Sequence, residues 1–158
     1  MPTPSATSNR PEDVILRLCS PETEVKFKAL RELKNQIIGN RTKKLSYVKL
    51  GAVPAVVSAL SLSADAGDFA GLVQASAVIG SFACGLEAGV RAVLDAGAFS
   101  LLFRLISHHC DHKVQSRFEF DCSILTSFGW IFEATMEMEL NYDVDFVFIG
   151  VAGFNFEN

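Results

Sequence analysis

The sequence lacks any apolar run long enough to cross a membrane, although 49% of its 158 residues are hydrophobic. A transmembrane helix needs about 20 consecutive, mostly apolar residues, and no stretch of the chain reaches that length. The first eleven residues, MPTPSATSNRP, also lack the apolar core behind a basic start that marks a signal peptide. We therefore expect a protein without a membrane partner, located in the cytoplasm and nucleus.

Cysteine is sparse, and the motifs of common enzyme classes are absent. The four Cys, at positions 19, 84, 110 and 122, are irregularly spaced in a chain without a secretion signal, so free thiols are expected. We expect Cys84 to be a packed thiol rather than a nucleophile. No G-x-G-x-x-G follows a strand and no G-K-[ST] occurs, which excludes the common phosphate-binding loops.

One segment resembles a metal site, HHCDH at residues 108–112. Imidazole and thiolate are good zinc ligands, but no second ligand pair exists to complete a tetrahedron, so we favour a solvated helix end. The sequence therefore predicts no catalytic residue, no cofactor, no metal and no small-molecule substrate. A small hydrolase or redox protein that uses Cys or His is the alternative class.

Positive charge is nearly missing from the end of the chain. Residues 114–158 hold one basic residue, Arg117, and eight acidic residues, whereas residues 1–113 hold thirteen basic and ten acidic residues. The last segment also contains eight of the thirteen Phe and the only Trp. These shifts predict a disordered N-terminus at 1–11, a folded region at 12–112 and an acidic, Phe-rich tail at 113–158. The net charge of −4 argues against a nucleic-acid partner.

The chain repeats itself with an offset of 46 residues. This offset aligns Gly39 with Gly85 and Gly51 with Gly97, and it places apolar residues between 33 and 60 on apolar residues between 79 and 106. A period of about 40 to 47 residues is typical of solenoids whose units are two or three helices. The sequence therefore predicts an all-α structure with two units and a partial third.

Apolar spacing predicts the helices within each unit. In the first long helix Val25, Ala29, Leu33 and Ile37 recur every four residues, as on the buried face of an amphipathic helix. The polar segment 63–68 is predicted to be a loop. The expected helices are 24–38, 42–50 and 53–62 in the first unit, 69–82, 87–96 and 99–109 in the second, and a third long helix from about Asp111.

The run 51–60, GAVPAVVSAL, has a Gly-Ala pair before a Pro and a helix of paired aliphatic residues. This run resembles the motif of the armadillo-repeat family. With Lys34-Asn35, Gly80, Gly85 and Leu94, the region from about 12 to 110 is most similar to a family member found in the CTLH/GID ubiquitin-ligase complex. The resemblance implies a right-handed α-superhelix and a non-enzymatic protein-interaction scaffold. It also implies ligase subunits as partners and a role in protein degradation.

The candidate binding residues come from the first unit. Asn35 matches the position at which many armadillo proteins bind extended peptides, whereas the second unit has Ser81 there. Arg41, Lys43, Lys44 and Lys49 form a basic group that we place on the exposed side of the short helix. These residues are the candidate protein-binding set, and an importin-like or nucleic-acid and cargo-binding module is the alternative function.

The repeat pattern ends near Lys113. The following residues, QSRFEFDC, do not continue the amphipathic pattern of a third long helix. We interpret the tail as irregular sequence that was not selected to fold onto the repeats, such as read-through past a splice site or a truncated gene model. An acidic-aromatic interaction tail is the alternative.

Overall fold

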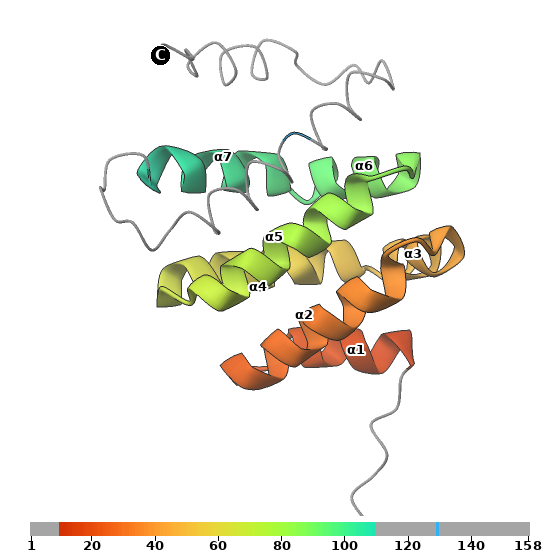
Figure 1. The fold of residues 1–158 in the computed structure, drawn as a ribbon, viewed down its shortest axis with the longest axis horizontal. Helices are drawn as coiled ribbons and strands as arrows, with labels where there is room; N and C mark the ends of the chain where they lie inside the picture. The colour runs from red at the N-terminus through yellow and green to blue at the C-terminus, as the bar shows by residue number, and fades with distance from the viewer. Residues whose placement is uncertain (1–9, 110–128, 130–158) are drawn as a thin grey trace, which may run out of the picture.

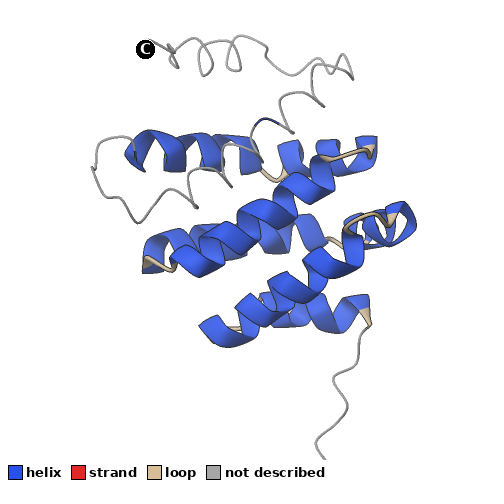
Figure 2. Cartoon of the chain, viewed as in Figure 1, coloured by secondary structure: helices blue, strands red, loops and turns tan. Residues whose placement is uncertain are grey.

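The computed structural model describes residues 10–109 and Gly129 (Figure 1). Seven helices occupy the continuous described part: α1 Pro11–Leu18, α2 Thr23–Ile37, α3 Arg41–Lys49, α4 Ala52–Ala66, α5 Phe69–Ala83, α6 Glu87–Asp95 and α7 Ala98–His109. Between them the described residues form turns and loops without a strand (Figure 2). The predicted all-α class is confirmed.

The 46-residue offset is confirmed by the helix bounds. Both ends of α2 and α5, and both ends of α3 and α6, differ by 46 residues, as do the first residues of α4 and α7. The turns repeat as well, because Gly51 and Gly97 precede α4 and α7 with φ of 80° and 73°. Glycine adopts this left-handed conformation at little cost, so the glycine repeat has a backbone cause.

Equivalent helices of successive units pack against each other. The long helices α2 and α5 lie side by side in Figure 1, the short helices α3 and α6 are in contact, and α4 contacts both α1 and α7. Each unit would expose the apolar side of its helices if it stood alone, and stacking buries it. Each unit thus contributes a long helix (α2, α5), a short helix (α3, α6) and a further helix (α4, α7), an arrangement that fits armadillo-type repeats.

The core runs through all seven helices. Leu33 of α2 and Ile79 of α5, which the offset aligns, are both completely buried, as are Val56 of α4 and Leu102 of α7. Phe82 and Tyr47 are the largest fully buried side chains. The inward assignment of Leu33 and Ile79 is therefore confirmed.

A close approach between α5 and α6 requires a glycine. A Cβ atom on Gly89 would clash with the backbone oxygen of Phe82. The equivalent residue of the first unit is Lys43, which is exposed. The second unit is thus packed more tightly at this point than the first.

The predicted loop at 63–68 is mostly wrong. α4 continues to Ala66. Ser63 is buried within this helix, and its hydroxyl lies 3.5 Å from Oδ2 of Asp68. Asp68 is the N-cap of α5 and accepts a hydrogen bond from the backbone N–H of Gly71 at 3.0 Å. Ser63 therefore takes part in the junction between two helices, which composition alone suggested to be a loop.

The apolar spacing does not predict α1. It begins at Pro11, where the missing N–H costs no helical hydrogen bond, and buries Val14 and Leu18. Val14 is equivalent to Leu60 of α4, which is also buried, so α1 corresponds to the last part of an α4-type helix. The third long helix expected from Asp111 and the tail at 113–158 lie outside the continuous described part, and the three domain bounds stay predictions.

Among the described residues, no single helix is long and apolar enough to span a membrane. α3 and α4 together have sufficient length and apolar composition, but they meet at a bend of 79°. Both helices also contribute buried side chains to the core.

Candidate protein-interaction surface

The five predicted binding residues lie on two consecutive helices of the first unit. Asn35 is exposed near the C-terminal end of α2, and Arg41, Lys43 and Lys49 are exposed on α3. Lys44 is different, because only 8% of it is exposed. The structure therefore brings four of the five residues to the surface.

The placement of Lys44 on a solvated face is wrong. Its ammonium group donates a 2.7 Å hydrogen bond to the backbone oxygen of Cys84, just past the end of α5. Burial lowers the pKa of Lys44 below its ordinary value, and the neighbouring Arg41 adds to this decrease. The aliphatic stem packs inside while the ammonium reaches a carbonyl, as long cationic side chains commonly do.

Arg41 binds the same end of α5. Its Nη1 donates a hydrogen bond of 3.1 Å to the backbone oxygen of Gly85. The last carbonyls of a helix have no intrahelical partners and carry partial negative charge, so two cations from the first unit cap the long helix of the second. Arg41 and Lys44 thus join the units, which leaves Lys43 and Lys49 as the exposed lysines of α3.

The exposed face of the long helices differs between the units. Asn35 is exposed on α2, whereas its equivalent Ser81 is 9% exposed and donates its hydroxyl to the backbone oxygen of Ala77 at 2.8 Å. A repeated asparagine side chain is therefore absent from α5. The two helices are linked instead by Lys34, whose Nζ donates to Oε1 of Gln74 at 3.0 Å.

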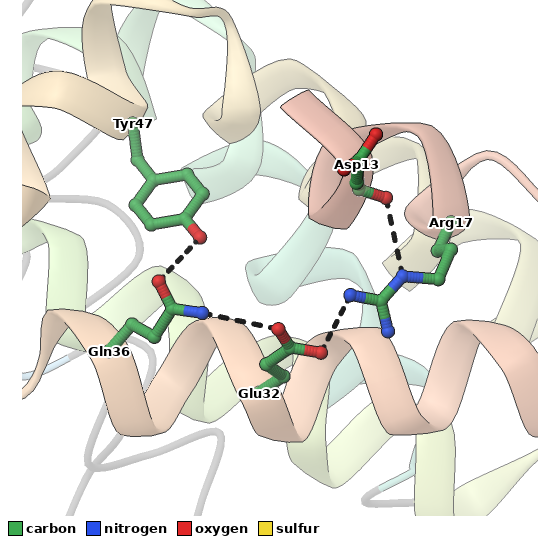
Figure 3. A network of polar contacts seen from close by, with 5 residues as sticks. All are labelled: Asp13, Arg17, Glu32, Gln36 and Tyr47. Carbon is green, nitrogen blue, oxygen red and sulfur yellow. Dashed lines mark hydrogen bonds and ion pairs between the residues drawn. The ribbon is translucent and has the colours of Figure 1, made fainter. Parts of the chain in front are cut away.

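A polar network joins α1 to the first two helices of the first unit (Figure 3). Arg17 of α1 binds Glu32 of α2, with Nη2 and Oε2 2.7 Å apart, and its Nε donates to the backbone oxygen of Asp13 at 3.3 Å. Gln36 donates to Oε1 of Glu32 at 3.2 Å and accepts from the Tyr47 hydroxyl at 2.9 Å. The network ties α1, α2 and α3 together.

Tyr47 is the buried end of this network. Its side chain is completely buried, and burial, together with the negative charge of Glu32, raises the pKa of Tyr47 to about 12. The hydroxyl therefore stays protonated and serves as a donor. This is a structural role, because Tyr47 cannot be reached from solvent.

Sequence reasoning missed the network, although the offset contained a signal for it. The residues 46 positions after Arg17, Glu32, Gln36 and Tyr47 are the small or apolar residues Ser63, Val78, Phe82 and Val93. Charged and polar residues at positions that are apolar in the next unit are expected to bond to one another when buried.

The cysteine and metal predictions have different outcomes. Cys84 is an exposed free thiol, so its assignment as a packed residue is wrong; it occupies the C-cap of α5, where the chain leaves the helix. Among residues 10–105, whose side chains the structure describes, metal-ligating side chains form no group of three that could hold a metal. The side chains of segment 108–112 lie outside the described residues, and its interpretation stays a prediction.

Comparison with known proteins identifies relatives for half of the chain. The chain is 30% identical over 79 residues to armadillo repeat-containing protein 8 of Pongo abelii and of Mus musculus. The match covers 50% of this chain and 11% of each relative, so the chain spans about a tenth of their length. No family model matches. Over half of its length the chain is therefore similar to a part of armadillo repeat-containing protein 8, and its stacked helical units fit armadillo-type repeats.

Proposed function

We propose that this protein is a non-enzymatic scaffold that binds other proteins. The observation that supports this function is the stack of α2 and α5, with α3 and α6 beside it, in units of 46 residues. Stacked helical units give extended surfaces suited to contacts with other proteins. The exposed residues Asn35, Arg41, Lys43 and Lys49 would contribute to such a surface, and Lys44 would support it from inside.

We further propose that the partners are subunits of a CTLH/GID-type ubiquitin-ligase complex, in the cytoplasm and nucleus. This part rests on the similarity to armadillo repeat-containing protein 8, which covers half of the chain. In such a complex the protein would support protein degradation through binding alone. The importin-like and nucleic-acid alternatives have weaker support, because Arg41 and Lys44 already bind backbone carbonyls of the second unit.

Purification of the tagged full chain from cells tests this proposal. Subunits of the ligase complex should be recovered with the parent chain and with Cys84→Ser, because the thiol has no catalytic task in a scaffold. The variant Leu33→Asp places a charge in the core and should lose them with its helical circular dichroism.

The decisive comparison is a folded surface variant. Asn35→Ala combined with Lys43→Glu and Lys49→Glu changes exposed residues only and should retain helical circular dichroism while it loses partners. If the folded parent chain recovers no ligase subunit, the ligase assignment is wrong. If the surface variant binds the same subunits as the parent, these residues do not form the binding surface.

A further inference from the structure

Positive charge is concentrated on two helices of the first unit. α2 and α3 contain eight Lys and Arg against two Glu, whereas residues 50–109 contain two Arg against four acidic residues. Within α3 four of nine residues are basic and none is acidic. We call the exposed members, Arg41, Lys43 and Lys49, the α3 basic surface.

The repeat fold does not require this charge. The residues of α6 equivalent to Arg41, Lys43 and Lys49 are Glu87, Gly89 and Asp95, although α3 and α6 have the same length and place in their units. The positive charge is therefore a property of the first unit alone. Because the Lys44 ammonium lies beneath this surface, its charge adds to the potential there.

A segment of the same chain has the complementary charge. Residues 133–145, EATMEMELNYDVD, contain five acidic residues and no basic residue. We propose that this segment docks on the α3 basic surface and covers it. An acidic partner protein must then displace the segment in order to bind.

The length of the connecting chain permits this contact. Residues 110–132 separate α7 from the acidic segment, and an extended chain spans about 3.3 Å per residue, or roughly 75 Å in all. A helix of 15 residues is only about 22 Å long. A tethered segment is present at an effective concentration in the millimolar range. Even weak ion pairs therefore let it occupy the α3 basic surface for a larger fraction of the time than a free acidic peptide would.

Zero-length cross-linking of the full chain with a carbodiimide tests the proposal, because this reagent joins an ammonium to a carboxylate only when they touch. Trypsin releases residues 118–158 as one peptide, since no Lys or Arg follows Arg117. We expect this peptide to be joined to Lys43 and Lys49. Lys44 is an internal control, because its buried ammonium should not react. The yield should fall severalfold in about 1 M salt, where the Debye length is about 3 Å.

Matched charge reversals complete the test. Lys49→Glu should lower the yield of the cross-link between the acidic segment and Lys43, which keeps its own ammonium, whereas Lys26→Glu with Lys28→Glu in α2 should leave the cross-links to Lys43 and Lys49 in place. The absence of these cross-links in the parent chain would overturn the proposal. A mixture of ¹⁵N-labelled and unlabelled chains identifies the source of the segment: cross-links mainly between the two isotopes would make a second copy the occupant and would equally overturn it.

Discussion

Lys44 of α3 and Val90 of α6 occupy the same position of successive units, and both side chains are buried. Valine is buried there without a polar partner, whereas lysine needs an acceptor for its ammonium. The backbone oxygen of Cys84 supplies that acceptor at 2.7 Å. One position of the repeat therefore accommodates an apolar residue and a cation, and the cation also links the two units.

Replacement of Lys44 by methionine tests the value of this link. Methionine keeps most of the aliphatic stem and removes the ammonium, which leaves the Cys84 carbonyl without its donor. We expect the free energy of unfolding in urea to fall by about 1 to 3 kcal/mol. Lys43→Met makes the same chemical change at an exposed neighbour and should alter stability by less than about 0.5 kcal/mol. Equal effects of the two changes would contradict a structural role for Lys44.

A pair of leucines tests the core. Leu33 is completely buried, while Leu16 is 73% exposed. Leu33→Ala should lower the free energy of unfolding by about 2 to 5 kcal/mol through lost burial and an unfilled cavity. Leu16→Ala should change it by less than about 0.5 kcal/mol. Denaturation followed by circular dichroism measures both, and similar losses would show that the inward face of α2 has been misassigned.

Gly89→Ala tests the close approach of α5 and α6. The new methyl group would clash with the backbone oxygen of Phe82, so the helices must separate. Overpacking of this kind costs about 1 to 3 kcal/mol, although alanine is otherwise the better helix former. Lys43→Ala at the equivalent exposed position is the control, and no loss is expected. A Gly89→Ala protein as stable as the parent would show that the contact relaxes freely.

The raised pKa of Tyr47 predicts that the folded chain loses stability at high pH. The pKa of Tyr47 is raised to about 12 in the folded chain, against about 10 in the unfolded chain, so the folded state holds the phenolic proton more tightly. This contribution is complete below about pH 10 and is lost as pH rises toward 12. For a shift of about two pKa units it amounts to roughly 3 kcal/mol.

Tyr47→Phe provides the comparison for that measurement. It removes the titrating group, so the variant should lose less stability than the parent between pH 9 and 12. It should also be less stable than the parent at neutral pH, because Gln36 loses its donor. Parallel pH profiles of the parent and the variant would mean that Tyr47 titrates as if exposed.

The repeat was predictable because its signals are local. Glycine at Gly51 and Gly97 is needed for a left-handed turn, and the apolar spacing around Leu33 follows the helical period. One failure concerns a residue whose partner is distant in sequence. Lys44 pairs with a carbonyl 40 residues later. The prediction for Ser63 failed for another reason, because the polar composition of segment 63–68 suggested a loop where α4 continues. A charged or polar residue is expected to be exposed, but it can be buried where the fold provides a hydrogen-bond partner.

The polar network has a consequence for how the units find their places during folding. Because the helix bounds repeat every 46 residues, a chain could pair its helices one unit out of step. α2 would then occupy the place of α5, and Glu32 and Gln36 would enter the environment of Val78 and Phe82, away from Arg17 and Tyr47. A buried carboxylate without its arginine is strongly disfavoured. A pairing of helices shifted by one repeat would therefore break the network. Its residues thus distinguish two units that are otherwise similar and disfavour the shifted pairing.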